Sequence, residues 1–333
     1  MATAKCFSDK LKMTTLLTGS TGFVGSAIAR QCQAVNLPIR QTDRSSQPSQ
    51  PNYTQADILA PSSLTPIMEG VECVIHAAGL AHQFGKKQSA VPFTEVNVIG
   101  TENIAQAAAS AKVQHFILIS SVSVYGNEGM SSCTEETICK PHGPYAQSKY
   151  QAEQRALAIA QEAGMRLTIL RLATVYGEGD PGNVVRLIRA IDQKRFLWLG
   201  EGKNRKSLIH RDDVARACIA VLQSSGTGIS TYNLSSPPCT MREIVETIAD
   251  SLKKPVPQWQ IPASPLLLMT NLASRLIGKD SFAGKLHATM QKWVNDDVYD
   301  ASAFQRALNF QPQVSLNEGL QREVAWYNTT KRK

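Results

Sequence analysis

The 333-residue sequence lacks paired cysteines, long apolar runs and an apolar N-terminal segment. Its seven cysteines are scattered and none forms a CxxC pair, so neither a zinc site nor a disulfide framework is indicated. The longest apolar stretch, Pro265–Met269, is far too short to span a bilayer. Residues 1–12 contain no apolar core of the kind found in secretory signals. We therefore expect a cytoplasmic protein that has no integral membrane segment and binds no metal ion.

Charge of one sign is in excess but is not concentrated. Basic residues outnumber acidic residues by 35 to 27, a formal net charge of +8, and they cluster only at Lys203–Lys206 and Lys331–Lys333. Neither cluster has interleaved aromatic residues or zinc-finger spacing, so we expect no nucleic-acid partner. A solvated basic surface is the simplest interpretation, and attraction of a phosphorylated substrate or loose adhesion to an anionic membrane remain as alternatives.

The first half of the chain alternates short apolar runs with helical patterns, and 43% of all residues are hydrophobic. This alternation predicts an α/β protein with a doubly wound parallel (Rossmann) sheet. The predicted strands are Thr14–Thr18, Pro38–Thr42, Cys73–Ala77, His115–Ser120 and Leu167–Arg171. The predicted helices are Gly22–Ala34, Thr94–Ser110, Tyr145–Glu162 and, later in the chain, Asp213–Leu222.

Gly19, Gly22 and Gly25 follow the first predicted strand and open the first predicted helix. Glycine lets a backbone approach a pyrophosphate closely, and a helix N-terminus directs N–H groups at the anion, so this spacing predicts a dinucleotide site. Asp43 ends the second predicted strand, where a carboxylate can bind the adenosine ribose and repel a 2′-phosphate, which favours NAD. Arg44 follows it and can pair with such a phosphate, so NADP remains possible.

Tyr145 and Lys149 lie one helical turn apart, and Ser121 follows the strand predicted just upstream. Parallel sheets place ligands at the carboxyl ends of their strands, so Ser121 should hold a reacting oxygen together with Tyr145. A free tyrosine has a pKa of ~10, and bringing it near neutrality takes roughly 4 kcal/mol of phenolate stabilisation. The Lys149 ammonium can supply much of this, so Tyr145 is the predicted base at an alcohol whose hydride leaves for a nicotinamide.

Three nearby residues have structural interpretations. Tyr125 is expected to pack in the turn after the strand, and Ser120 to face the sheet interior because strand side chains alternate. His76 lies in an apolar run and is expected to be a structural residue beneath the cofactor.

Several further segments follow in order along nearly the whole chain. They are Ala56-Asp57-Ile58, His76-Ala77-Ala78-Gly79, Asn97-Val98-x-Gly100-Thr101, Ser120-Ser121-x-x-Val124-Tyr125-Gly126, Arg171-x-x-x-Val175-Tyr176-Gly177, Ser207–Ala215 and Tyr299-Asp300 through Tyr327. Together with the glycine turn and the Tyr145/Lys149 pair, they resemble the extended short-chain dehydrogenases/reductases of the NAD-dependent epimerase/dehydratase family, which include nucleotide-sugar enzymes such as UDP-galactose 4-epimerase.

The resemblance implies positions for the whole site. For the cofactor it implies Gly19, Thr21, Gly22, Phe23, Val24, Gly25, Asp43, Arg44, Asp57, Ile58, Ala77, Ala78, Gly79, Asn97, Tyr145 and Lys149. For catalysis it implies Ser121, Tyr145 and Lys149, and for a nucleotide-diphosphate sugar Ser121, Ser123, Asn183, Arg205, Lys206 and His210. It also implies a homodimer that pairs through the helices at Thr94–Ser110 and Tyr145–Glu162. Lys206 stands where relatives carry a phosphate-binding arginine, and Arg205 lies one place early.

The resemblance leaves several outcomes open. Dehydratases of the family carry an acid pair after the catalytic hydroxyl residue, whereas this chain has Val122 and Ser123, which disfavours dehydration. The first interpretation is C4 epimerisation of a UDP-hexose or UDP-N-acetylhexosamine through a 4-keto intermediate. The alternatives are NAD(P)H-dependent reduction of a 4-keto nucleotide sugar, oxidation of a sterol-like alcohol beneath the apolar stretch Pro265–Leu276, and a non-catalytic NAD(P) sensor.

Beyond Tyr176 proline and glycine interrupt the pattern. We expect residues 1–175 to form the dinucleotide-binding Rossmann domain. Residues 176–333 should form mainly a smaller, irregular substrate-binding subdomain, with residues 213–222 packing back on the sheet.

Overall fold

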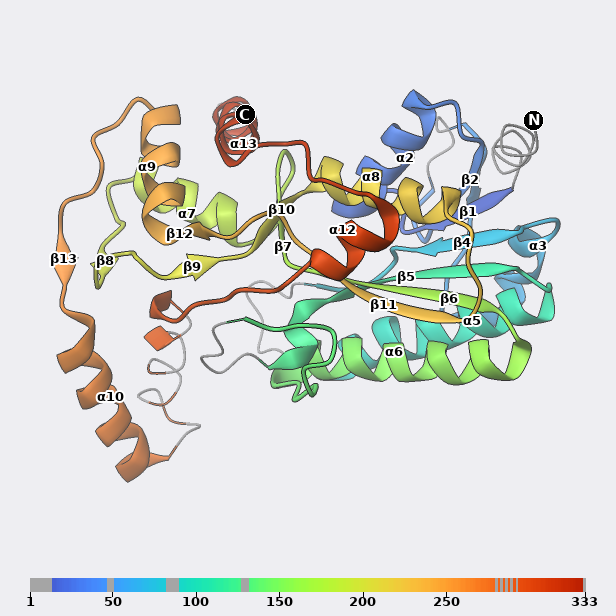
Figure 1. The fold of residues 1–333 in the computed structure, drawn as a ribbon, viewed down its shortest axis with the longest axis horizontal. Coiled ribbons are helices and arrows are strands. Elements are labelled where there is room, and N and C mark those ends of the chain that lie inside the picture. Colours follow the sequence, from blue (N-terminus) through green and yellow to red (C-terminus); the bar gives the residue numbers. More distant parts are fainter. Residues whose placement is uncertain are drawn as a thin grey trace.

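The computed structural model describes residues 14–46, 51–81, 90–126, 132–278 and 293–331, together with residues 281, 284, 287, 290 and 291. Seven parallel strands form one twisted sheet in the order β11-β6-β5-β4-β1-β2-β3 (Figure 1). Their bounds are β1 Thr15–Thr18, β2 Ile39–Asp43, β3 Tyr53–Gln55, β4 Cys73–His76, β5 His115–Ser121, β6 Arg166–Leu172 and β11 Ile229–Leu234. The order reverses beside β1, which is the arrangement of a Rossmann sheet.

The five predicted strands are confirmed to within one residue at each end, and two further strands of this sheet were missed. Strand β3 has only three residues, all at least partly exposed, so it carries no apolar run. Strand β11 lies in the part of the chain that was expected to be irregular, and it pairs with β6.

Helices cover both faces of the sheet, so the central strands bury both sets of side chains. Leu17, with its neighbours on one face, packs against helices α2 (Phe23–Ala34), α8 (Arg211–Gln223) and α12 (Ser302–Leu308). Leu16, on the other face, packs with α3 (Thr65–Met68), α5 (Gly100–Ser110) and α6 (Gly143–Ala163). The helix predicted at Thr94–Ser110 begins as a π-helical segment, η2 (Thr94–Ile99). Short helical turns η1 (Pro61–Ser63), α4 (Ala90–Phe93) and η3 (Val122–Tyr125) complete this part.

The remaining elements lie beside the sheet and surround a second core built around Ile188, Trp198 and Ile248 (Figure 1). Its strands form three short pairs, β7 (Thr174–Tyr176) with β10 (Leu208–His210), β9 (Arg205–Lys206) with β12 (Cys239–Thr240), and β8 (Trp198–Leu199) with β13 (Gln260–Ile261). Its helices are α7 (Asn183–Asp192), α9 (Met241–Ser251) and α13 (Leu316–Thr330), and α10 (Ala263–Ile277) contributes no residue to it. Helix α8, which covers residues 213–222, and helix α12 contribute side chains to the core on the sheet, and β11 is the edge strand of that sheet.

Candidate functional site

The glycine turn joins β1 to α2 and lies tightly against the end of β4. Gly19 has φ +68°, and a β-carbon built on it would lie 2.6 Å from the backbone nitrogen of Ala78. A β-carbon on Gly25 would overlap the carbonyl oxygen of Gly19. No side chain caps the N-terminus of α2, which begins at Phe23. The turn therefore offers a helix N-terminus and a closely packed backbone, which suit a pyrophosphate.

Asp43 lies at the end of β2, beside this turn. Its carboxylate accepts hydrogen bonds from the Thr21 hydroxyl at 2.6 Å, the Thr21 N–H at 3.3 Å and the Arg44 N–H at 2.7 Å. The Arg44 residue is exposed. The structure therefore places both residues at the edge of the turn, with the carboxylate directed into it and held by Thr21.

The other predicted cofactor residues surround the same edge of the sheet. Asp57 accepts the N–H of Leu59 at 2.9 Å, and Ile58 occupies the space left open by Gly100. Asn97 clamps the chain after β4, since its amide accepts the N–H of Leu80 at 2.7 Å and donates to the Leu80 carbonyl at 3.0 Å.

Ala77, Ala78 and Gly79 follow β4 directly. The Ala78 N–H donates to the Thr18 hydroxyl at 3.3 Å, and a β-carbon on Gly79 would lie 3.9 Å from Lys149 Nζ. This segment thus runs from the glycine turn towards Lys149.

His76, at the end of β4, is buried between the hydroxyls of Thr18 at 2.7 Å and Thr101 at 3.0 Å. Burial, and secondarily the charge of Lys149, lower its pKa to about 3. The neutral ring therefore ties β1, β4 and α5 together beneath the glycine turn, in the structural position expected for it.

Ser121, Tyr145 and Lys149 converge at the carboxyl end of β5. Ser121 ends the strand, and its hydroxyl accepts the N–H of Ser123 at 3.2 Å. Lys149 is buried and donates to the Ile119 carbonyl at 2.6 Å. Tyr145 lies one turn earlier on α6, and its ring packs edge-on against Phe93 with centroids 5.9 Å apart.

Burial of this group shifts the pKa values of Tyr145 and Lys149. Burial raises the pKa of Tyr145, and its hydrogen bond with Ser121 opposes the shift. Burial lowers the pKa of Lys149 to about 8, and the carboxylate of Glu153 opposes that shift. The ammonium of Lys149 therefore lies close to its point of proton loss in a weakly alkaline solution.

A buried network behind the site was missed from the sequence. Glu153, one turn after Lys149, accepts hydrogen bonds from Ser120 at 2.5 Å and from Arg171 at 2.7 Å. Arg171 also donates to the Tyr125 hydroxyl at 2.9 Å, which in turn donates to Asn233 at 2.7 Å. The four-residue spacing from Lys149 to Glu153 was the available signal. Tyr125 is completely buried, and burial raises its pKa to about 12, so it is a packing residue.

The predicted substrate residues lie in different surroundings. Within the described part of the chain, the Ser123 hydroxyl is buried without a hydrogen-bond partner. Asn183 is exposed at the start of α7, where the carboxylate of Asp180, not Asn183, accepts the N–H groups of Gly182 at 2.6 Å and Val185 at 3.1 Å. Asn183 thus presents its amide at the surface, whereas the Ser123 hydroxyl is enclosed by protein.

Arg205 and Lys206 are held by a neighbouring segment that the sequence pattern did not indicate. Arg205 forms an ion pair with Asp296 at 3.0 Å, and Lys206 donates to the Asn295 carbonyl at 3.0 Å. Asp296 would compete with a phosphate for Arg205, and the Asn295 carbonyl takes one of the three ammonium protons of Lys206.

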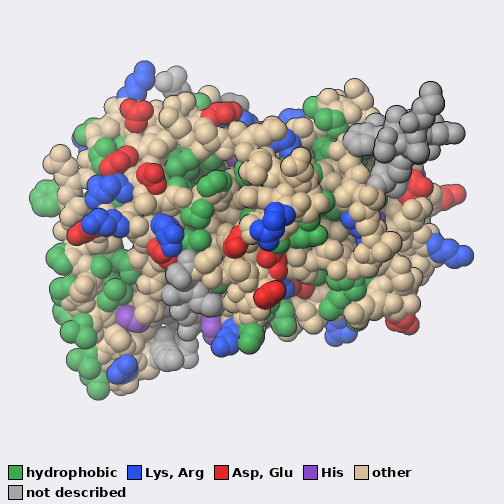
Figure 2. All heavy atoms as spheres, viewed as in Figure 1, with side chains coloured by type: hydrophobic (Ala, Val, Ile, Leu, Met, Phe, Trp, Pro, Cys, Tyr) green, Lys and Arg blue, Asp and Glu red, His purple; other side chains and the backbone are tan. Residues whose placement is uncertain are grey.

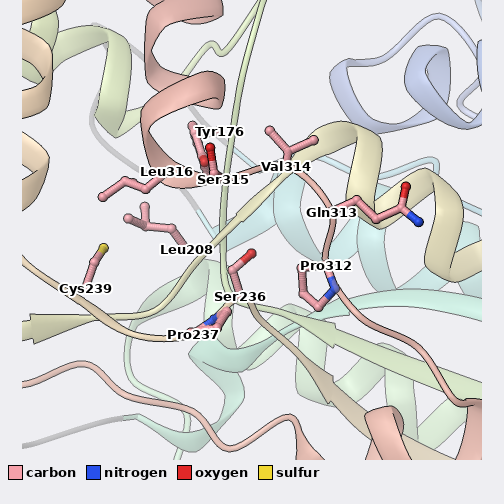
Figure 3. A pocket seen from close by; sticks show the side chains of 10 residues that line it. All are labelled: Tyr176, Leu208, Ser236, Pro237, Cys239, Pro312, Gln313, Val314, Ser315 and Leu316. Atoms are coloured by element: carbon pink, nitrogen blue, oxygen red, sulfur yellow. The ribbon is translucent and has the colours of Figure 1, made fainter.

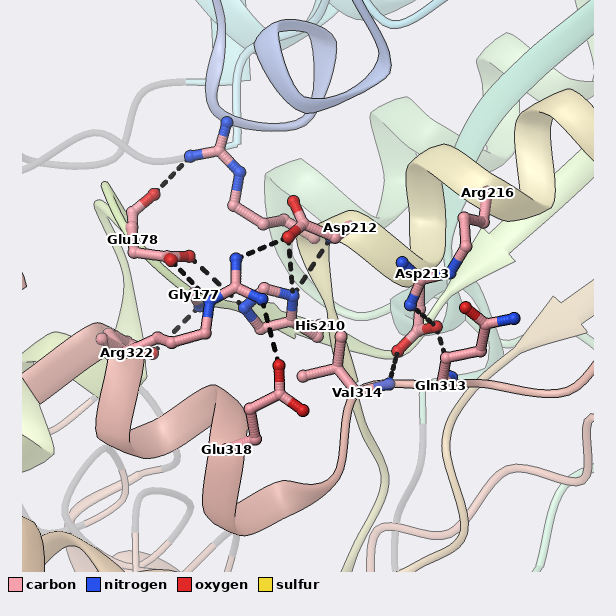
Figure 4. Close-up of polar contacts among 12 residues, drawn as sticks. Gly177, Glu178, His210, Asp212, Asp213, Arg216, Gln313, Val314, Glu318 and Arg322 are labelled. Atoms are coloured by element: carbon pink, nitrogen blue, oxygen red, sulfur yellow. Dashed lines mark hydrogen bonds and ion pairs between the residues drawn. The ribbon is translucent and has the colours of Figure 1, made fainter. Parts of the chain in front are cut away.

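His210 is completely buried, and it caps α8 by accepting the N–H of Asp212 at 3.2 Å (Figure 4). Its other nitrogen lies 3.4 Å from the carboxylate of Glu178. Arg322 of α13 joins the same cluster, bonding Glu178 at 2.7 Å and Asp212 at 2.5 Å (Figure 4). Burial lowers the pKa of His210. His210 therefore belongs to a polar cluster, called here the joint, that connects β10 and α8 with α13.

Two further residues of this joint were missed. The Arg211 guanidinium stacks on the Phe23 ring at 4.9 Å and donates to the Ser26 hydroxyl at 2.7 Å, which links α8 to the glycine turn. Glu323 is completely buried and accepts the Gly177 N–H at 3.0 Å. Burial, with Asp180 nearby, raises the pKa of Glu323 to about 9.

A cavity of about 340 Å³ lies elsewhere, between β7, β10 and the chain before α13 (Figure 3). Its lining includes Tyr176, Leu208, Cys239 and Leu316 and is mainly apolar. It shares no residue with the group around Tyr145. Among the described residues no cluster of three potential metal ligands occurs, and no helix of the described residues is long and apolar enough to cross a membrane.

Comparisons with known proteins agree on one family. Residues 15–235 match the NAD-dependent epimerase/dehydratase family. A UDP-glucose 4-epimerase of Vibrio cholerae is 28% identical, covering 94% of this chain and 95% of that protein. The N-acetyl-alpha-D-glucosaminyl-diphospho-ditrans,octacis-undecaprenol 4-epimerase of Escherichia coli O157:H7 is 27% identical, covering 93% and 94%. DesIV, a dTDP-glucose 4,6-dehydratase of Streptomyces venezuelae crystallised with NAD, superposes with a TM-score of 0.76 at 25% identity, covering 96% and 98%.

Proposed function

Because the chain belongs to the NAD-dependent epimerase/dehydratase family and is an NAD-dependent enzyme of the extended short-chain dehydrogenase type, we propose that it epimerises C4 of a UDP-hexose or UDP-N-acetylhexosamine through a 4-keto intermediate. The observation that carries the proposal is the convergence of Ser121, Tyr145 and Lys149 at the carboxyl end of β5, next to the glycine turn. The positions after Ser121 are Val122 and Ser123, so the carboxyl group that water elimination requires is lacking there.

The described residues fit NAD. The space above Gly19 and Gly25 is too narrow for a β-carbon, as a turn held against a pyrophosphate requires. We assign the adenosine ribose to Asp43, which Thr21 already orients, and the nicotinamide ribose to Lys149. The Ile119 carbonyl takes one of the three ammonium protons of Lys149, which leaves donors for ribose hydroxyls. When bound, NAD supplies a reversible acceptor for the hydride of the sugar carbon.

In this proposal Tyr145 removes the proton from the sugar hydroxyl. Burial favours the neutral phenol in the structure, so the phenolate depends on positive charge brought close to it. The Lys149 ammonium provides such a charge, and Ser121 holds the reacting oxygen within reach of the phenolate. After rotation of the keto sugar, the hydride would return to the opposite face of C4 while Tyr145 returns the proton to the oxygen, and the opposite configuration results.

A second candidate differs in the carrier of the sugar. The relative from Escherichia coli named above acts, by its name, on a sugar diphosphate linked to undecaprenol. An exposed apolar helix, α10, is the specific observation that favours a lipid-linked sugar here, because leucines at Leu268, Leu272 and Leu276 face outward. The same Ser121, Tyr145 and Lys149 would serve both substrates.

The homodimer stays part of this proposal. Helices α5 and α6 pack side by side on one face of the sheet, and the same helices in a second copy would pair with them. Size-exclusion chromatography with light scattering tests it, and a monomer at all concentrations would contradict it.

The decisive experiment measures bound cofactor and substrate together. Purified protein is denatured and its supernatant assayed for NAD(H), and intact protein is incubated without added cofactor with UDP-glucose, UDP-GlcNAc and their C4 epimers. Retained NAD with interconversion of one epimer pair supports the proposal. Turnover that requires added NADH or NADPH would indicate that the protein is a reductase and not an epimerase.

A Tyr145→Phe variant identifies the base in the same assay. We expect epimerisation to fall about 10²- to 10⁴-fold, because the ring is kept while the proton-accepting oxygen is lost. Bound NAD should be unchanged. Undiminished turnover would remove Tyr145 from the chemistry, and a Tyr125→Phe variant gives the matched tyrosine comparison with the buried residue.

A further inference from the structure

Helix α10 exposes the side chains that a helix normally buries. Thr270 and Ser274, four residues apart, are its buried positions, and the Thr270 hydroxyl lies 2.9 Å from His287 Nδ1. Leu268 and Leu276 are 71% and 79% exposed, with Leu272 between them on the same row of the helix. The inward side carries Thr270 and Ser274 beside the half-buried Leu266, Leu267 and Ala273, while the row Leu268, Leu272 and Leu276 faces outward. An ordinary surface helix keeps such a leucine row on its inner side.

The exposed apolar side chains of α10 occupy about half of its circumference: Leu268, Met269, Leu272, Leu276 and Ile277. Together with the exposed Trp259, four residues before the helix, they are called here the α10 face. In Figure 2 hydrophobic side chains gather over the position of α10, at the lower left of the molecule. Figure 1 shows α10 projecting there, away from the central sheet. Contiguous apolar surface of this kind on a folded protein marks an interaction site.

The segment that carries the α10 face has charges of one sign. From Ser251 to Gly278 the sequence contains no aspartate or glutamate, and its charged residues are Lys253, Lys254 and Arg275. Lys254 pairs with Asp192 at 2.6 Å, while Lys253 and Arg275 are exposed. Two copies of this face would bring like charges together, whereas anionic headgroups would attract them.

We propose that the α10 face docks on the surface of an anionic lipid bilayer. The leucine row and Met269 enter the boundary between headgroups and acyl chains, Trp259 lies at headgroup depth, and Arg275 pairs with phosphates. The helix lies on the membrane and does not cross it, since no helix in the described ranges can span one. The inference holds whichever diphosphate-linked sugar the enzyme turns over.

The test is co-sedimentation of the full-length protein with vesicles of phosphatidylglycerol and phosphatidylcholine, compared with vesicles of phosphatidylcholine alone. Wild type should bind the anionic vesicles more tightly. A Leu272→Glu/Leu276→Glu double variant should bind them at least about tenfold more weakly. Two apolar side chains that would move from water into the bilayer are replaced by charged ones. Ile138→Glu is the matched control, since Ile138 is 74% exposed but lies outside the α10 face.

Fold and oligomeric state are measured on the same samples. The double variant should keep its circular dichroism and its NAD content, so a failure of the proposed activity leaves the vesicle result readable. Vesicle binding that is absent in wild type, or equal in the double variant, overturns the inference. Dissociation of a wild-type dimer by the double variant, without vesicle binding, assigns the face to a second copy of the chain instead.

Discussion

Lys149 and Glu153 show how one helical turn couples the site to the core. Lys149 donates to the Ile119 carbonyl, and Glu153 neutralises Arg171 in the interior. Burial lowers the pKa of Lys149 to about 8, and Glu153 limits the fall. Below that pH the ammonium keeps its charge, and above it the charge that favours a Tyr145 phenolate is lost. The activity of the proposed epimerase should therefore decline as the pH rises through about 8.

The Glu153→Gln substitution is predicted to lower the free energy of unfolding and to lower the pH above which activity declines. Removing one partner of a buried ion pair leaves the Arg171 charge uncompensated, which costs about 3–5 kcal/mol of unfolding free energy. Urea denaturation measures the loss. The pKa that ends activity at high pH should also move to lower pH, because Glu153 no longer raises the pKa of Lys149.

Glu162→Gln is the control for that substitution, since Glu162 is exposed near the end of the same helix. It should change the unfolding free energy by no more than about 0.5 kcal/mol. Equal stability of the two variants would show that the Glu153–Arg171 pair contributes nothing net.

Helix α2 and the strands around it show why this end of the sheet was predictable. The glycine turn, β1 and α2 are continuous in sequence, so local spacing was sufficient to place them. Strand β11 depends instead on pairing with β6, and its own sequence contains the polar residues Ser230, Thr231 and Asn233. Asp180 precedes α7 by three residues, and its carboxylate accepts N–H groups at the start of the helix. Its role could therefore have been predicted from the sequence, although the family resemblance pointed to Asn183.

Gly25→Ala is predicted to abolish retention of NAD. The added methyl group would overlap the Gly19 carbonyl oxygen, which forces the turn away from α2. NAD content after purification and titration calorimetry with NAD measure the effect. Gly70→Ala is the comparison, because its β-carbon would have no atom within 4 Å, although φ +68° strains it. Loss of NAD in both variants would trace the effect to general destabilisation.

The C-terminal helix α13 holds the two cores of the molecule together. Arg322 bonds Glu178 after β7 and Asp212 on α8, while the next residue, Glu323, accepts the Gly177 N–H from the interior. Glu318, one turn earlier, lies 3.6 Å from Arg322 (Figure 4). Residues more than a hundred positions apart thus meet at the joint beside the glycine turn.

Glu323→Gln is predicted to flatten the pH dependence of stability. The folded protein holds the Glu323 proton up to a pKa of about 9, while the unfolded chain releases it near the ordinary value of 4.5. Between these values the folded state binds more protons, so stability must fall as the pH rises. Glutamine retains an acceptor for Gly177 and cannot ionise. The free energy of unfolding should differ less between pH 5 and pH 9 in the variant than in the wild type. An unchanged difference would contradict this prediction.

Residue types and their spacing were enough for the order of β1, α2, β4, β5 and α6 and for the grouping of Ser121, Tyr145 and Lys149, because strand ends in a parallel sheet meet at one edge. Contacts between distant segments settled the rest. The burial of His210 among Glu178 and Asp212, the capture of Arg205 by Asp296 and the outward leucines of α10 all depend on which segments pack together. No local pattern records such packing, since the free energy of a buried charge or an exposed leucine is set by neighbours that the chain brings together only on folding.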